Sequence, residues 1–137
     1  MTPRQSLAPR VLLVDASRDE REMYAESLRL EGFTTLQATS ASDAFRLASE
    51  LAPQVVVTGV KLEGQADGLA LARQIKASAA TRHVPVVVLS GYGSSQCREA
   101  AAQAGCDLFL VKPCLPDDLV NSITRFVPAH AHAAGWR

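Results

Sequence analysis

The sequence predicts an α/β domain in which a parallel β-sheet is covered by helices on both faces. Short apolar runs of strand length alternate five times with segments of helical apolar periodicity. Four of these helical segments begin at a serine or aspartate suited to a helix N-terminus. Strict alternation of strand and helix favours parallel pairing, because each right-handed crossover helix returns the chain to the same end of the sheet.

The first strand and helix are expected within residues 11–32. The apolar run 11–14 predicts the strand, and Ser17 with Glu20 three residues later matches a capping box. The helix is expected to end near Gly32, a residue suited to a helix C-terminus. Its apolar stripe is expected to consist of Met23, Tyr24, Leu28 and Leu30.

Residues 33–59 predict a second strand, a second helix and a third strand. Weak alternation over 33–38 indicates the second strand, and Ser40 with Asp43 begins a helix that Pro53 ends. The three valines at 55–57 then predict a strand buried on both faces. That strand runs into Gly59.

The remaining elements follow the same alternation. Asp67 caps a helix that runs to residue 77, and the apolar run 84–89 predicts a fourth strand. A fourth helix begins at one of the two serines at 94–95, and a fifth strand covers 108–111. The last helix begins near Pro116 and is expected to end at Pro128, with an apolar stripe of Leu119, Ile123 and Phe126.

Composition limits the function classes. The 137 residues are most simply one domain, expected over 9–128, with flexible ends at 1–8 and 129–137. Fourteen basic residues balance fourteen acidic ones, which gives no support for a nucleic-acid or membrane partner. No apolar run approaches the roughly 20 residues of a spanning helix, and no signal peptide is recognisable. We therefore expect a cytoplasmic protein, whose three cysteines are unpaired thiols.

Functional residues are expected where the strands end. In the flavodoxin-like strand order 2-1-3-4-5, a three-layer (βα)5 arrangement, ligands bind at the carboxyl ends of the strands beside the first and third strands. The residues that end strands 1, 3, 4 and 5 are Asp15, Gly59, Ser90 and Lys112. An acid, a hydroxyl and an amine that converge on one crevice indicate a phosphate or cation site.

Three segments, VLLVDA, PVVVLS and AGCDLFLVKPCLPDDL, resemble the receiver domain of two-component response regulators. The resemblance covers about residues 9–128 and implies a signalling domain, not an enzyme. In that family an aspartate that ends the third strand accepts a phosphoryl group from a histidine kinase, and a pair of acids after the first strand helps to hold Mg²⁺. Asp15 matches the first acid, Ser90 the hydroxyl and Lys112 the lysine. Phe109 matches the aromatic position whose exposure changes on activation.

Two positions depart from the family pattern. Ala16 stands where the second acid is expected, and Gly59 stands where the acceptor aspartate is expected. No aspartate or glutamate occurs between Glu50 and Glu63, so a shifted register does not restore the acceptor. Glycine offers no nucleophile, and the loss of two carboxylates predicts weak or absent Mg²⁺ binding and no other cofactor.

Without a metal ion, a lysine near this crevice is expected to balance the charge of Asp15. Either Lys112 or Lys61 is expected to pair with Asp15 and to take the electrostatic place of the metal; the alternative for Lys61 is a side chain that points into solvent. Pro113 matches a family proline whose preceding peptide bond is typically cis, which raises that expectation above the usual ~5–6% frequency for such bonds.

We interpret the chain as a degenerate receiver that acts by binding a protein. Candidate partners are a histidine kinase, another regulator or a second copy of the chain, in a possible homodimer. The resemblance points to a face built from the fourth helix, fifth strand and fifth helix, with Gln96, Arg98, Glu99, Gln103 and Phe109. Two alternatives stay open: a receiver phosphorylated on another residue, such as Asp15 or Ser90, and a flavodoxin-like small-molecule-binding module whose pocket occupies the space left by Gly59.

Overall fold

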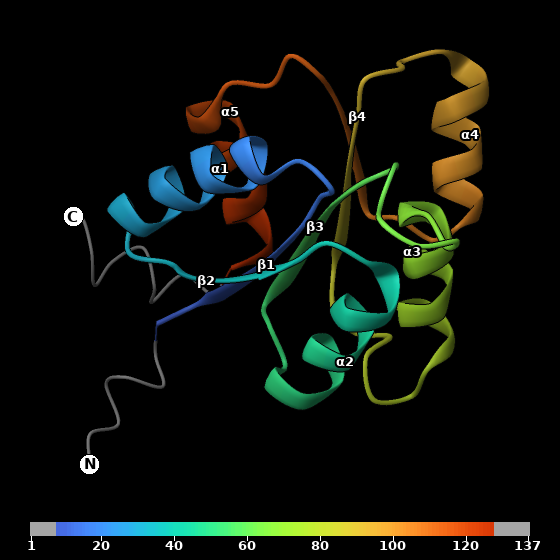
Figure 1. Ribbon diagram of the computed structural model, residues 1–137, viewed down its shortest axis with the longest axis horizontal. Coiled ribbons are helices and arrows are strands. Elements are labelled where there is room, and N and C mark those ends of the chain that lie inside the picture. The colour runs from blue at the N-terminus through green and yellow to red at the C-terminus, as the bar shows by residue number, and fades with distance from the viewer. Residues whose placement is uncertain (1–7, 128–137) are drawn as a thin grey trace.

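Five parallel strands form the centre of the molecule in the computed structural model, which describes residues 8–127 (Figure 1). Their order in the sheet is β2-β1-β3-β4-β5, so the predicted strand order and fold class are confirmed. The strands are β1 (Arg10–Val14), β2 (Thr34–Ala38), β3 (Val55–Gly59), β4 (Val86–Ser90) and β5 (Leu108–Val111). The helices are α1 (Arg18–Leu30), α2 (Ala41–Leu51), α3 (Gly68–Ala77), α4 (Ser95–Gln103) and α5 (Pro116–Ile123).

The helices form two layers, one on each face of the sheet. Helices α1 and α5 pack on one face, and α2, α3 and α4 pack on the other (Figure 1). Successive strand residues alternate between the two cores: Val11 and Leu13 face α1 and α5, whereas Leu12 and Val14 face the opposite layer. This alternation follows from the two-residue period of a strand. Both faces are apolar because both are covered.

Side-chain caps fix where four of the helices begin. Ser17, Ser40, Asp67 and Ser94 each accept a hydrogen bond from the backbone N–H three residues later, which satisfies one donor that the first helical turn leaves free. These four residues were the predicted caps, with Ser94 selected from the two adjacent serines. Helix α5 has no side-chain cap and begins with Pro116 at its first position.

The predicted apolar stripe of α1 is partly wrong. Tyr24, Ala25 and Leu28 are buried, but Met23 is 43% exposed and Leu30 is 79% exposed. A helix turns roughly 100° per residue, so the buried residues share one arc and Met23 and Leu30 lie on the opposite side. Leucine or methionine exposed singly is common on protein surfaces, so their apolar character did not indicate burial.

The chain leaves α5 earlier than predicted. Thr124–Phe126 forms a 3₁₀ turn instead of continuing the α-helix, and Phe126 packs half-buried against the core. Helix α4 attaches lightly, since its one buried residue is Ala101, followed by buried Ala104 just beyond its end. Pro128, the predicted stop, and residues 1–7 and 129–137 of the predicted flexible ends lie outside the described residues.

Helix α3 begins in close contact with the end of β3. The Gly68 N–H donates to the Val60 carbonyl oxygen at 2.7 Å. A Cβ atom on Gly68 would lie 1.9 Å from the Gly59 carbonyl oxygen, so a side chain cannot be accommodated there without moving the backbone. Within residues 8–127, no helix has the length and apolar character needed to cross a membrane.

Candidate functional site

A hollow of about 290 Å³ lies at the carboxyl end of the sheet. The loops after β1, β3, β4 and β5 converge there, as expected for a parallel sheet of this order. The hollow brings together the four residues predicted at the strand ends and two further residues of the predicted site, one at the position of the second acid and one in the loop after β3. They are Asp15, Ala16, Gly59, Lys61, Ser90 and Lys112.

The Asp15 carboxylate covers the end of β3. Its Oδ1 atom accepts a hydrogen bond from the Ser17 N–H at 2.8 Å, which fixes its direction. The backbone carbonyl of Asp15 accepts a hydrogen bond from the Arg21 guanidinium, also at 2.8 Å. A Cβ atom on Gly59 would lie only 2.9 Å from Oδ2 of Asp15. The carboxylate therefore occupies space that a side chain at position 59 would need.

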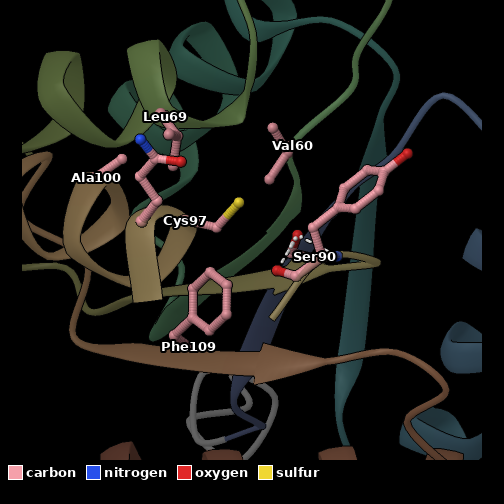
Figure 2. A pocket seen from close by; sticks show the side chains of 8 residues that line it. Val60, Leu69, Ser90, Cys97, Ala100 and Phe109 are labelled. Carbon is pink, nitrogen blue, oxygen red and sulfur yellow. Dashed lines mark hydrogen bonds between the residues drawn. The ribbon is translucent and has the colours of Figure 1, made fainter. Parts of the chain in front are cut away.

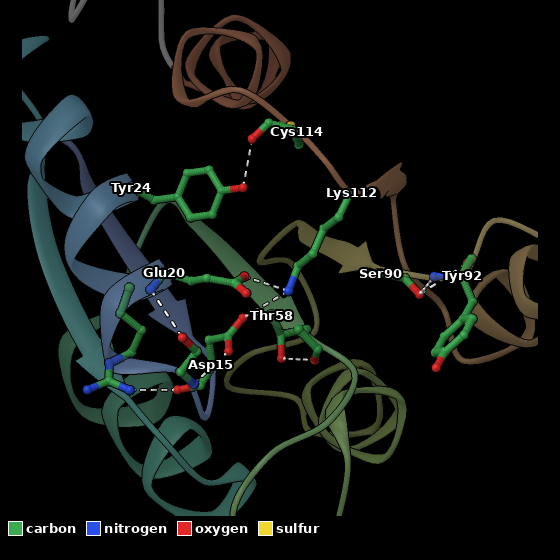
Figure 3. A network of polar contacts seen from close by, with 11 residues as sticks. Asp15, Glu20, Tyr24, Thr58, Ser90, Tyr92, Lys112 and Cys114 are labelled. Carbon is green, nitrogen blue, oxygen red and sulfur yellow. Dashed lines mark hydrogen bonds and ion pairs between the residues drawn. The ribbon is translucent and has the colours of Figure 1, made fainter.

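Lys112 pairs more closely with Glu20 than with Asp15. Its Nζ atom lies 2.6 Å from Oε1 of Glu20 and 3.6 Å from Oδ2 of Asp15 (Figure 3). Burial disfavours the charge on Lys112, but contact with Glu20 and the charge of Asp15 outweigh it and raise the pKa of Lys112. The expected Lys112–Asp15 pair is present at the longer distance. Lys61 is exposed and forms no ion pair among the described residues.

Glu20 is the site residue that sequence reasoning missed. The capping box predicts that its carboxylate returns to the Ser17 N–H. Only half of this box forms: the Ser17 hydroxyl accepts from the Glu20 N–H at 3.2 Å, whereas the Ser17 N–H donates to Asp15. The Glu20 carboxylate is therefore free to reach Lys112. An acid in the first turn of a helix that starts beside the site was the available signal.

Further hydrogen bonds lie at the rim of the hollow and beside it. The Ser90 side chain is buried, and its hydroxyl donates to the Tyr92 carbonyl at 3.1 Å and accepts from the Tyr92 N–H at 3.0 Å. Across the hollow, the Tyr24 hydroxyl donates to the Cys114 carbonyl at 2.7 Å (Figure 3). Burial, followed by nearby negative charge, raises the pKa of Tyr24 to about 12. The Lys112-Pro113 peptide bond between these groups is cis, as predicted.

The donor atoms in the hollow are a poor match for Mg²⁺, which prefers six oxygen ligands in octahedral geometry. Of the described residues that line the hollow, Asp15 alone carries a carboxylate, and the Lys112 ammonium lies 3.6 Å from it. Among residues 8–127, no group of three or more histidine, cysteine, aspartate or glutamate side chains is placed to hold a metal ion.

The residues of the expected signalling face lie on α4 and β5. Gln96, Arg98, Glu99 and Gln103 are exposed on α4, and Phe109 is half-buried on β5. The Arg98 guanidinium lies over the Phe109 ring, with Cζ 5.1 Å from the ring centroid. Beside Phe109 is a second, apolar cavity of about 200 Å³ between α3, α4 and the sheet (Figure 2).

Comparison with known proteins gives consistent matches. The sequence matches the family profile of the response regulator receiver domain over residues 11–124. It is 35% identical over 120 residues to the C4-dicarboxylate transport transcriptional regulatory protein DctD of Rhizobium meliloti, covering 88% of this chain and 25% of DctD. It is also 35% identical over 116 residues to the transcriptional regulatory protein PrrA of Mycobacterium tuberculosis, covering 85% of this chain and 48% of PrrA.

The chain thus spans half or less of the length of these curated relatives. Among solved structures, it is similar to the crystal structure of the receiver domain of NtrX from Brucella abortus. The two share 33% sequence identity, with a TM-score of 0.77, over 85% of this chain and 97% of the NtrX domain.

Proposed function

Because this chain belongs to the response regulator receiver domain family, we propose that it serves two-component signalling as a pseudo-receiver, not phosphorylated at the usual position. One observation carries the proposal. The last residue of β3 is Gly59, and the Asp15 carboxylate, not a nucleophilic side chain of β3, lies over it. An acyl phosphate requires a carboxylate at the position that accepts the phosphoryl group, and glycine has none.

The charges around Gly59 support the same proposal. Phosphoryl transfer needs cations that neutralise the charge developing on the phosphoryl oxygens. Lys112 is a cation that lines the hollow at this position, and it is already paired with Glu20 and Asp15. The Ser90 hydroxyl is likewise occupied, because both of its hydrogen bonds go to the Tyr92 backbone. The lysine and the hydroxyl that would contact a phosphoryl group thus already have partners within the chain.

The output proposed for this domain is contact with another protein. Receiver domains interact with histidine kinases and with other regulators, and these remain our candidate partners together with a second copy of the chain. We place the contact on the signalling face of α4 and β5, continued by α5, where Arg98 of α4 lies over the Phe109 ring. We further propose that the domain has no catalytic activity of its own and that it is located in the cytoplasm.

The direct test is intact mass after incubation with acetyl phosphate and Mg²⁺. We expect no phosphoryl adduct on the wild-type chain and an adduct on the double variant Gly59→Asp with Ala16→Asp, which restores a nucleophile and a metal ligand. The matched control is Gly59→Asn with Ala16→Asp, which has the same size at position 59 but no carboxylate. An adduct on the wild type would overturn the proposal, and peptide mapping would then show whether Asp15 or Ser90 carries it.

The location of the contact has its own test. Sedimentation velocity at increasing concentration measures self-association, and Glu99→Arg on α4 is expected to weaken it. Glu50→Arg, which changes another exposed acid, on α2, is the matched control. If Glu50→Arg weakens association as much as Glu99→Arg, or if neither does so while the wild type associates, the contact lies outside the signalling face.

A further inference from the structure

The apolar cavity beside Phe109 is separate from the hollow at Asp15, although Val60, Ser90 and Tyr92 line both. Its other walls come from α3, α4 and β5, through Leu69, Gln96, Cys97, Ala100 and Phe109. Its volume is about 200 Å³. An apolar cavity of roughly 150 Å³ is enough to hold benzene. The apolar cavity therefore has room for one aromatic ring.

One aromatic side chain lies at the edge of this cavity without being buried in it. Tyr92 contributes to the lining, yet 77% of its surface is exposed. Among the large apolar side chains that are exposed in residues 8–127, it is the only aromatic one. Moving an aromatic ring from water into an apolar environment is favourable. Burial in the apolar cavity would therefore stabilise the Tyr92 ring relative to its exposed position.

The backbone at Tyr92 is held in place while its side chain is free to rotate. The buried Ser90 hydroxyl accepts from the Tyr92 N–H at 3.0 Å and donates to the Tyr92 carbonyl at 3.1 Å. A Cβ atom on Gly93 would lie 2.9 Å from Cγ2 of Val111, so the loop lies directly against the end of β5. The other neighbour, Gly91, has no side chain and faces open space. Neither neighbour thus places a side chain in the way of the ring.

Tyr92 borders both spaces, but their chemistry favours the apolar one for its ring. Burying the ring in the hollow would remove water from the charged groups of Asp15 and Lys112, which is costly. The apolar cavity instead offers carbon atoms of Leu69 and Ala100. The Gln96 amide is exposed at its edge and has no hydrogen-bond partner among the described residues, so it is available to the tyrosine hydroxyl.

We propose that Tyr92 is a lid whose ring rotates into the apolar cavity, against Leu69, Cys97 and Ala100, and closes it. Closure fills the space between α3, α4 and β5 and so changes the surface next to the proposed signalling face. An apolar group of a protein partner that enters the cavity has to displace the ring, so partner binding selects the open position. The inference goes beyond the pseudo-receiver proposal and holds whether or not the chain can be phosphorylated.

Cys97 provides a reporter for closure, because its sulfur is directed into the apolar cavity (Figure 2). Alkylation of each cysteine by N-ethylmaleimide is followed by peptide mass mapping. We expect Tyr92→Ala to accelerate alkylation of Cys97 roughly fivefold, since burial of part of the ring keeps the wild-type chain mostly closed. Tyr92→Phe keeps the ring and should retain the wild-type rate. Cys106 and Cys114, which lie outside the lining, are internal references with unchanged rates.

The matched control is Leu115→Ala. Leu115 is another exposed apolar side chain, with 65% of its surface accessible, but it does not line the cavity. Its removal is expected to leave the alkylation rate of Cys97 unchanged. Both positions are exposed, so the variants are expected to fold, and circular dichroism checks this.

Methyl NMR provides a second measurement that does not depend on thiol reactivity. In the closed position the Tyr92 ring should shift the methyl resonances of Leu69 and Ala100, and this shift should be lost in Tyr92→Ala and kept in Tyr92→Phe. Equal alkylation of Cys97 in the wild type and Tyr92→Ala, or methyl resonances that Tyr92→Ala leaves unchanged, would overturn the proposal. An equal acceleration in Leu115→Ala or Tyr92→Phe would overturn it too, because the effect would not then depend on the Tyr92 ring.

Discussion

Lys112, just beyond β5, and Glu20, in the first turn of α1, form a 2.6 Å ion pair, and Lys112 lines the hollow at Gly59. The pair joins two segments that are far apart in sequence, and it keeps the Lys112 ammonium within 3.6 Å of Asp15. The Lys112 ammonium thus forms ion pairs with two carboxylates. Removing any one of the three charged groups changes the environment of the other two.

Replacing Glu20 by glutamine is expected to loosen this arrangement without unfolding the chain. Both partners are partly exposed, with 27% of the Lys112 side chain and 37% of the Glu20 side chain accessible, so the expected loss is about 1 kcal/mol or less. The pKa of Lys112 should fall because its nearest anion is gone. Urea unfolding measures the first effect, and NMR titration of the Lys112 side chain measures the second.

The control for this substitution is Glu22→Gln, an exposed acid on the same helix that takes part in no ion pair among residues 8–127. It is expected to leave stability within about 0.5 kcal/mol of the wild type. If the two variants have the same free energy of unfolding and the same pKa of Lys112, the ion pair with Glu20 makes no measurable contribution in solution.

Introducing aspartate at position 59 alone is expected to destabilise the chain by about 1–2 kcal/mol. The new Cβ would lie 2.9 Å from Oδ2 of Asp15, and the new carboxylate would add a like charge beside it. Gly59→Asn, which has the same shape without the charge, should cost less. Thermal unfolding with and without Mg²⁺ separates the repulsion between carboxylates from the steric effect of the new side chain. Mg²⁺ should restore stability to Gly59→Asp with Ala16→Asp but not to Gly59→Asn.

The raised pKa of Tyr24 predicts a loss of stability at high pH. The phenol ionises near pH 10 in the unfolded chain but only near 12 in the folded one, so between these values the unfolded chain binds fewer protons. The contribution of Tyr24 is therefore complete below pH 10 and declines as the pH rises toward 12. Tyr24→Phe also removes the hydrogen bond to the Cys114 carbonyl, at an expected cost of about 1 kcal/mol at neutral pH.

Denaturant unfolding of the wild type and Tyr24→Phe at several pH values measures this difference. The gap between the two proteins should shrink and then reverse sign as the pH rises from 10 to 12. A gap that stays constant across this range would mean that the Tyr24 hydroxyl ionises equally readily in both states.

Alanine at position 68 is expected to be severely destabilising. Its Cβ would overlap the Gly59 carbonyl oxygen at 1.9 Å, so the start of α3 would have to move away from the end of β3, at a cost of about 3 kcal/mol. Gly91→Ala is the control, because a Cβ there meets no atom within 4 Å. Thermal unfolding of both variants tests the contact, and similar melting temperatures would show that α3 accommodates the side chain by a small shift.

Much of the fold follows from local sequence signals, and the predictions that were wrong have a common origin. Caps at Ser17, Ser40 and Asp67 and the valine-rich strands could be predicted because each depends on residues close together in the chain. The exposure of Met23 and Leu30 could not, because the sequence shows that α1 is amphipathic but does not fix which arc of the helix meets the sheet.

The candidate site divides in the same way. The sequence could predict that one hollow contains Asp15, Gly59, Ser90 and Lys112, because parallel strands in this order end at the same edge of the sheet. The preference of Lys112 for Glu20 depends on the direction of the first turn of α1 and on Ser17 bonding to Asp15 instead. The cavity beside Phe109 depends on how far α4 stands from β5, a distance that no local pattern encodes.

The light attachment of α4 has a consequence for local unfolding. A helix that buries only Ala101, with Ala104 buried just beyond its end, loses little apolar contact when it detaches, so it can open while the sheet remains intact. Its backbone amides should therefore exchange with deuterium sooner than those of α1, which is anchored by Tyr24 and Leu28. The surface proposed for partner contact thus lies partly on a helix whose opening is expected to cost less than that of α1.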